Sequence, residues 1–321
     1  MNSLPERDGP CGFVAAQVSS KWPHRLAVAT AGATLPLLFI GGLVTGKGAG
    51  LAVPDWPTTF GYNMFLYPWS KMVGGIFYEH SHRLVASAIG LLTIFLALAF
   101  WLKEERRWLR LLALGALALV IVQGVLGGLR VVLLEHGLAI VHAAVAQAFF
   151  ALVVSLAVFT SGQWAERPAR PLAAGDRLRR LCASTAAFIY FQSVLGAVLR
   201  HTGGRADLHL LFAAVVAAHG ILVLRRLLRF HADRPELVRP GIALGTLLAL
   251  QLALGGAVYF GKFTTLLRWP ADLVVVLATL HLLVGALMLG TSLILTLRCY
   301  RLTVFRPLGH GPELAAERAP A

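Results

Sequence analysis

Apolar positions fill most of the chain in long runs, and short polar segments separate the runs. Each run is close to the length at which a helix crosses the roughly 30 Å hydrocarbon core of a bilayer. Eight such runs lie at about 25–45, 84–102, 109–129, 138–160, 181–199, 208–228, 240–260 and 273–297. The pattern predicts an all-α integral membrane protein with eight transmembrane helices.

The ends of the odd-numbered runs repeat one another. The pattern Gln-x-x-Leu-Gly-small begins at Gln123, Gln192 and Gln251, and the first run carries Gly41-Gly42 without the glutamine. Recurrence of one pattern predicts a repeated helical hairpin. Paired small residues also allow simple close packing of helices, so the glycines alone do not identify a site. We therefore expect two pseudo-repeated four-helix bundles.

A segment rich in Pro, Arg and Gly divides the runs into two groups of four. The domains predicted from this division are an N-terminal bundle at 1–162, a cytosolic linker at 163–180, a C-terminal bundle at 181–297 and a cytosolic tail at 298–321.

Composition and charge agree with a membrane protein. Hydrophobic residues make up 57% of the chain and charged residues 14%, which excludes an ordinary water-soluble globule. The net charge is +14, and 21 of the 29 Lys and Arg residues fall on the side that holds both termini. This is the positive-inside distribution, so the charge predicts topology and not nucleic-acid binding. We expect a multi-pass protein of the cell (inner) membrane with both termini in the cytosol.

The cysteines predict no structural disulfide. Cys11, Cys182 and Cys299 all fall in or near the cytosolic side of the predicted topology, where thiols stay reduced.

Each even-numbered apolar run has a histidine near its start. Four residues after each one, on the same helix face, comes Ala or Gly, which leaves room for a flat ligand. These histidines are His82, His142, His209 and His281. Two imidazoles facing each other across a four-helix bundle suit the axial positions of a haem iron, whereas zinc would need a cluster of Cys, His and carboxylate ligands. Because Cys-x-x-Cys-His is absent, such a haem would be held non-covalently.

Other histidines remain alternatives to these ligands. His136 is the main rival of His142, and His201 or His219 would replace a ligand of the second bundle. His80 lies on another helix face from His82, and we expect it at the membrane interface. A transporter built from repeats is a further interpretation, which predicts a protein without haem.

One acid distinguishes the first bundle. Glu79 precedes His82 by three residues and Arg83 follows it, whereas alanine occupies the matching position before the other three histidines. Ionisable groups beside hydrocarbon are costly and are read as functional by default. The first bundle is therefore the candidate reaction site and the second the candidate cofactor site.

The first outer loop, about residues 47–78, contains Pro54-Asp55-Trp56-Pro57 and a series of aromatic residues. Aromatic side chains favour the headgroup region. A membrane-surface anchor and a lid over a site both explain this loop.

These residues together resemble the haem A synthase family over nearly the whole chain. The resemblance rests on Gly-Gly-Leu-Val-Thr-Gly at 41–46, the Pro-Asp-Trp-Pro loop, Glu79-x-x-His82-Arg83 and the histidine that opens each later even-numbered helix. Many bacterial relatives carry a cysteine pair near the positions of Val53 and Phe60, and this chain lacks it. A mechanism through a loop disulfide is therefore not expected here.

The resemblance implies an oxidoreductase that oxidises the C8 methyl of haem O to the formyl group of haem A for cytochrome oxidase. Carried over, His209 and His281 would ligate a haem b cofactor, and His82 and His142 would flank the substrate haem. Glu79 and Arg83 would be catalytic, with Glu79 stabilising positive charge at the methyl carbon or orienting water.

The partners implied are the farnesyltransferase that produces haem O, a quinone or another electron acceptor, and the lipid membrane; homo-oligomerisation stays open. The alternative is a non-enzymatic di-haem b-type electron-transfer protein, which would give Glu79 and Arg83 no task.

Overall fold

The computed structural model describes residues 21–165, 172, 177–264 and 268–303. Within these ranges the chain is helical, and its only strand-like contact is an isolated bridge between Thr59 and Tyr62. The α-helices are α1 (Lys21–Gly46), α2 (Gly75–Lys103), α3 (Arg107–Leu133), α4 (His136–Phe159), α5 (Gly162–Ala165), α6 (Arg177–Thr202), α7 (Ala206–Phe230), α8 (Pro235–Phe263) and α9 (Ala271–Thr303). Two 3-10 turns, Met64–Leu66 and Trp69–Lys71, lie in the first loop.

All of these helices except the short α5 are long and apolar enough to cross a membrane, eight in the described ranges. The predicted all-α membrane protein with eight transmembrane helices is confirmed. Helix α6 begins at Arg177 and α9 runs on to Thr303, so both extend into the segments predicted as linker and tail.

Helix α2 begins at Gly75 instead of near residue 84. The preceding Gly74 has a φ of +56°, a conformation that glycine adopts without the penalty of a side chain, and the chain turns there from loop into helix. The first turns of α2 contain polar residues, which the apolar pattern left outside the helix. As a result, Glu79, His82 and Arg83 lie within the helix and not at its mouth.

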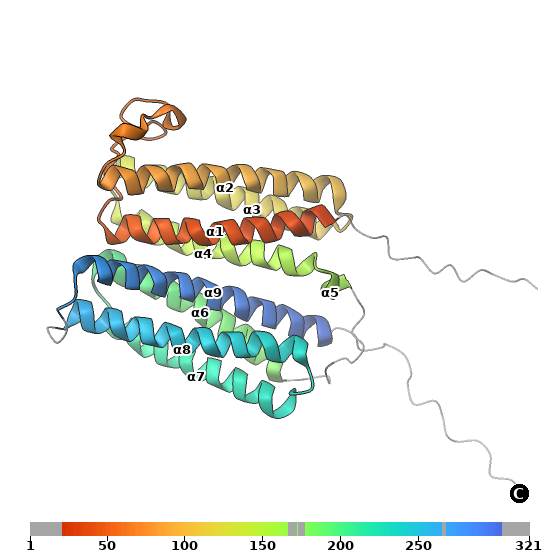
Figure 1. Cartoon of the computed structure of the whole chain (residues 1–321). Helices are drawn as coiled ribbons and strands as arrows, with labels where there is room; N and C mark the ends of the chain where they lie inside the picture. The colour runs from red at the N-terminus through yellow and green to blue at the C-terminus, as the bar shows by residue number, and fades with distance from the viewer. Residues whose placement is uncertain (1–20, 166–171, 173–176, 265–267, 304–321) are drawn as a thin grey trace, which may run out of the picture.

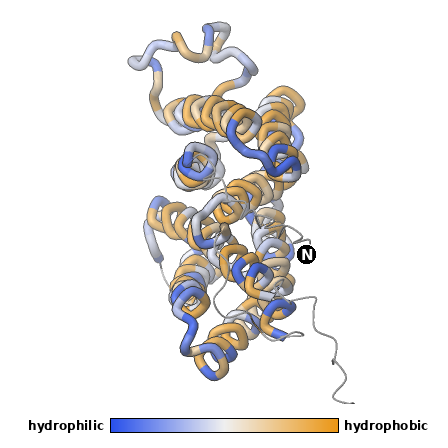
Figure 2. Tube along the Cα trace, turned by 90° about the vertical axis from the view of Figure 1, so that its right-hand side faces the viewer, coloured by the Kyte–Doolittle hydropathy of each residue, from blue (hydrophilic) through white to orange (hydrophobic). Residues whose placement is uncertain are grey.

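The long helices form two stacked groups (Figure 1). In the first, α1 packs on α2, α2 on α3, α3 on α4, and α4 back on α1; in the second, α6, α7, α8 and α9 contact one another in the same cyclic order. Orange, hydrophobic residues dominate the helices, and the connecting segments are bluer (Figure 2).

The two bundles meet through α1 and α4 on one side and α6 and α9 on the other. Phe150 and Val154 of α4 form a small buried cluster with Ala286 of α9. Glycines let the helices approach: a side-chain carbon on Gly42 would lie 2.7 Å from Cγ2 of Thr279. The interface is therefore apolar and closely packed.

The start of α1 and the end of α9 lie at the same end of the helices, opposite the first loop (Figure 1). Two of the three cysteines lie in the second bundle: Cys182 and Cys299 are buried, with sulfur atoms 3.9 Å apart. Cys11 lies outside the described residues.

Candidate functional site

Each of the four predicted histidines lies against a glycine of the preceding long helix. A side-chain carbon on that glycine would lie 2.9–3.4 Å from the imidazole Cε1 atom in every case. The contacts are His82 with Gly41, His142 with Gly127, His209 with Gly196 and His281 with Gly255. The glycines of the sequence repeat therefore make room for the imidazoles as well as for helix packing.

The first pair of imidazoles comes from α2 and α4. His82 and His142 are close enough to interact electrostatically, and the Nδ1 atoms of both rings are buried without a hydrogen-bond partner at bonding geometry. A buried polar atom left unbonded is costly, so such atoms mark places where a ligand or a water completes the structure.

The second pair comes from α7 and α9, and its rings are held by the glutamines of the repeat. His281 donates a hydrogen bond from Nδ1 to the carbonyl oxygen of Gln251 at 3.2 Å. The side-chain amide of Gln192 lies 3.2 Å from Nδ1 of His209 and donates to its carbonyl oxygen at 2.9 Å. A metal-binding histidine typically donates its other ring N–H to an acceptor, as His281 does here. The sequence indicated the glutamines as a repeat but not this role.

The spacing of the second pair fits one iron between two rings. Bonds from a metal to imidazole nitrogen are about 2 Å long, which puts two rings on opposite sides of one ion roughly 6 Å apart between centres. The ring centres of His209 and His281 are 6.4 Å apart, and the rings are inclined by 70°. With Nδ1 of His281 bonded to the main chain, its Nε2 is the nitrogen left for a metal, and the Gln251 side-chain amide, 3.4 Å from Nε2, would turn aside when a metal binds. The residues present therefore fit a haem iron.

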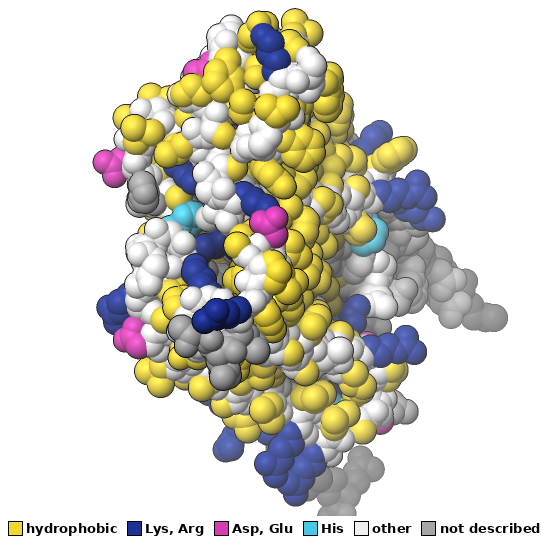
Figure 3. Space-filling model, turned by 60° about the vertical axis from the view of Figure 1, so that its left-hand side comes forward, with side chains coloured by type: hydrophobic (Ala, Val, Ile, Leu, Met, Phe, Trp, Pro, Cys, Tyr) yellow, Lys and Arg dark blue, Asp and Glu magenta, His cyan; other side chains and the backbone are white. Residues whose placement is uncertain are grey.

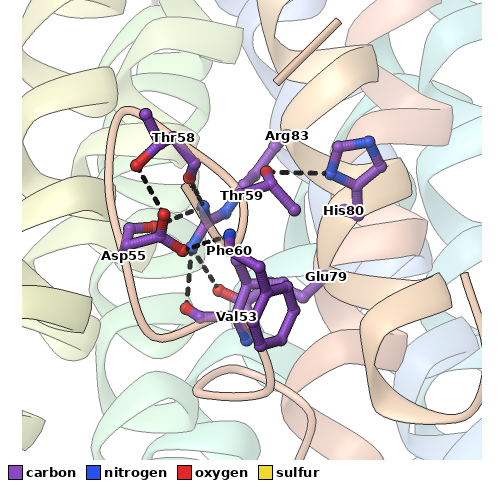
Figure 4. A network of polar contacts seen from close by, with 8 residues as sticks. All are labelled: Val53, Asp55, Thr58, Thr59, Phe60, Glu79, His80 and Arg83. Atoms are coloured by element: carbon purple, nitrogen blue, oxygen red, sulfur yellow. Dashed lines mark hydrogen bonds and ion pairs between the residues drawn. The ribbon is translucent and has the colours of Figure 1, made fainter. Parts of the chain in front are cut away.

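Glu79 and Arg83 form a buried ion pair that also fastens the first loop (Figure 4). Glu79 accepts a hydrogen bond from the Val53 amide at 2.9 Å and from Arg83 at 2.8 Å. Arg83 donates to the carbonyl oxygens of Asp55 at 2.7 Å, Thr58 at 3.1 Å and Val53 at 3.1 Å. These contacts make Arg83 a positioning residue in this state, and the predicted catalytic roles of both residues remain predictions.

The Asp55 carboxylate organises the turn of the same loop. It accepts hydrogen bonds from the Thr58 hydroxyl at 2.5 Å and from the amides of Phe60 at 2.7 Å and Gly61 at 2.9 Å. Burial raises the pKa of Asp55, but these hydrogen bonds to the charged form outweigh it and hold the pKa below its ordinary value. The turn is thus built around an ionised carboxylate.

The first loop both covers the bundle and offers apolar surface. The indole of Trp56 lies directly over Gly128, next to the glycine that faces His142. In contrast, the side chains of Phe65, Leu66 and Trp69 are 66–77% exposed. One part of the loop therefore caps α3, and another part suits a membrane interface.

The remaining histidines take other positions. The interfacial position expected for His80 is wrong: its side chain is buried under the loop, 3.2 Å from the Thr59 hydroxyl and packed on Tyr67. The loop folds back over α2, which sequence alone does not reveal. His219 lies 3.5 Å from the Thr185 hydroxyl and packs on Phe188. His201 lines a cavity at the loop end, and the side chain of His136 lies outside the described residues.

Two arginines near the imidazole pairs had no predicted role. Arg200 of α6 is close enough to His281 to act on it electrostatically, and it donates hydrogen bonds to the Gly42 carbonyl oxygen at 2.5 Å and the Thr279 hydroxyl at 3.5 Å. Arg130 of α3 acts in the same way on His82 and His142. Each pair thus has a guanidinium nearby.

Comparison with known proteins gives two matches to part of the chain. Residues 69–210, which include Glu79, Arg83 and three of the four histidines, match the family model described as "Cytochrome oxidase assembly protein". A protein of Shouchella clausii (strain KSM-K16) named "Heme A synthase" is 37% identical over 110 residues. That match covers 34% of this chain and 35% of the relative, about a third of each.

Proposed function

Since both matches support the haem A synthase family for this chain, we propose that it is a membrane-bound oxidoreductase that converts haem O to haem A. The reaction oxidises the C8 methyl group of the substrate to a formyl group: one water supplies the oxygen atom, and four electrons and four protons are released. The electrons pass to a quinone or another acceptor. The chain would lie in the cell membrane with both termini in the cytosol, as the placement of its basic residues favours.

The observation that carries this proposal is the difference between the two imidazole pairs. The first has a buried acid one helical turn before a histidine, Glu79 before His82, whereas Asp207 before His209 has a side chain that is 74% exposed. Nδ1 of His82 is buried without a hydrogen-bond partner among the described residues. The second pair is fixed by Gln192 and Gln251. A loosely held pair beside an acid suits a substrate that is bound and released, and a fixed pair suits a resident cofactor.

His209 and His281 would hold the haem b cofactor, which supplies one-electron transfer when bound. His82 and His142 would flank haem O as substrate. The Glu79 carboxylate would favour positive charge developing at the methyl carbon, or orient the water that attacks it. Arg83 would hold Glu79 in place and keep the loop closed over the bundle, excluding bulk water.

The proposal is tested in a host that makes haem O and lacks haem A. Expression of the chain should yield haem A in extracts of the membranes, measured by chromatography. Glu79→Gln keeps an acceptor for the Val53 amide and removes the charge, so conversion should fall about 100-fold, the usual scale for loss of one electrostatic contact to a transition state.

Glu105→Gln is the matched control, because Glu105 is exposed in the α2–α3 connection. Normal haem A from Glu79→Gln, with the haem of the second bundle retained, would refute the role of Glu79. Bound haem in the wild type without any haem A would favour a di-haem electron-transfer protein instead.

A further inference from the structure

Arg130 is a half-buried cation near the first imidazole pair that lacks a hydrogen-bond partner. Its guanidinium makes no hydrogen bond or ion pair within the described part of the chain, whereas Arg200 bonds to a carbonyl oxygen and a hydroxyl. A guanidinium carries five donors, and those of Arg130 face a cavity in which a carboxylate could accept from them. Such a group indicates a missing anion or acceptor.

Two carboxylates lie near Arg130, and neither is bonded to its guanidinium among the described residues. The Glu79 carboxylate interacts with Arg130 electrostatically, without a hydrogen bond between them. That carboxylate is already bonded to Arg83 at 2.8 Å. Glu135, the other carboxylate, is exposed, so the guanidinium of Arg130 has room for an additional carboxylate on its cavity side.

A cavity of about 190 Å³ adjoins Arg130 at the loop end of the molecule. Thr45, Gly50, Glu135, Ala139 and His201 are among its other lining residues. Gly50 lies so close to the guanidinium that a side chain there would collide with it. Figure 3 shows basic and histidine side chains gathered on this face between the upper and lower parts of the molecule.

The size of the cavity limits what it takes. It is smaller than the roughly 300–1,000 Å³ of pockets that enclose drug-sized ligands, so a whole porphyrin does not fit. A carboxylate arm of a larger molecule does. Exposed Glu135 at its rim would repel an anion, so the contact has to be made at the Arg130 side.

We propose that Arg130 and this cavity receive a propionate carboxylate of the porphyrin held between His82 and His142. The inference rests on the proposed function for the identity of the porphyrin. Arg130 is then a positioning residue that sets which edge of the ring faces Glu79, since a guanidinium binds a carboxylate through paired hydrogen bonds.

The test uses the full chain purified with its own haem, titrated with iron protoporphyrin IX and with its dimethyl ester, in which both carboxylates are blocked. Binding is followed by the Soret difference spectrum. The wild type should bind the free acid roughly tenfold or more tightly than the ester, the scale of a charge-assisted hydrogen bond.

Arg130→Gln should remove this preference and leave binding of the ester unchanged, and Arg130→Lys should keep part of it. Arg205→Gln, an exposed arginine on the same side of the membrane, should behave as wild type. Equal binding of acid and ester by the wild type, or equal loss of both in Arg130→Gln, would overturn the inference. If the preference for the free acid depends on Arg130 but the chain makes no haem A, the inference about Arg130 stands. Only the proposed reaction is then refuted.

Discussion

The ring nitrogens of single histidines separate the two bundles more clearly than any other feature. In the second bundle, Nδ1 of His281 is bonded to a main-chain oxygen and an amide lies beside His209. In the first, Nδ1 of His82 is buried without such a bond among the described residues, and the Gln123 main chain is the group that reaches His142. Fixing one ring nitrogen orients the other toward a metal, so the second pair is the better permanent site.

His209→Ala and His281→Ala should each abolish the low-spin absorption of the cofactor haem, because one axial position is lost. The haem content should be measured as a pyridine haemochrome. His219→Ala is the control on α7, since that ring contacts Thr185 and Phe188 instead. An unchanged low-spin spectrum in either ligand variant would assign the iron to another histidine.

Arg83→Gln should release the first loop. The change leaves Glu79 as an unpaired buried charge, and loss of one partner of a buried pair costs about 3–5 kcal/mol. Hydrogen exchange measured by mass spectrometry should become faster at residues 53–61. Lys47→Gln removes an exposed ion pair to Asp272, whose side chain is 79% exposed, and should leave the exchange at residues 53–61 unchanged. Equal exchange in both variants would mean that the loop is held by its other contacts.

At the scale of elements, the structure follows the sequence where the signal is local. Runs of apolar residues are properties of single helices, and the eight helices that they predict are present. The start of α2 at Gly75, the position of His80 and the contacts of Arg83 depend on a loop folding back from residues far away in sequence. The pairing of Arg130 with the first site likewise arises only when α3 meets α2 and α4.

Two adjacent glycines of one repeat, Gly255 and Gly256, allow a matched test of how closely an imidazole packs on the neighbouring helix. Gly255→Ala would place a carbon 2.9 Å from Cε1 of His281, whereas Gly256→Ala meets nothing within 4 Å. In both variants the replacement of Gly by Ala favours the helical conformation by about 1 kcal/mol. We expect Gly255→Ala to shift the haem spectrum and lower haem content, and Gly256→Ala to leave both unchanged. The same spectrum from both variants would show that the ring moves aside freely.

At the scale of the whole molecule, two bundles with separate imidazole pairs are joined by an apolar interface. The contact between Gly42 and Thr279 lies within it, and Arg200 reaches across it to the Gly42 carbonyl oxygen. The relation between the two sites therefore depends on how α1 packs against α6 and α9.

Gly42→Ala should destabilise this interface, because its new carbon would lie 2.7 Å from Cγ2 of Thr279. Overpacking of this kind costs about 1–3 kcal/mol, so the thermal midpoint in detergent should fall. Gly32→Ala, on the same helix with nothing within 4 Å, should leave the midpoint unchanged or raise it. A midpoint for Gly42→Ala at or above that of Gly32→Ala would mean that the interface adjusts without strain.

The glycine behind each imidazole has a consequence for assembly. Main-chain atoms back every ring, so the rings take their orientation when the helices associate, before any porphyrin arrives. A preorganised pair loses little conformational entropy when it captures its ligand. The orientation of the imidazoles is thus a property of the helix packing, so a change in that packing would alter the imidazole pairs even far from them in sequence.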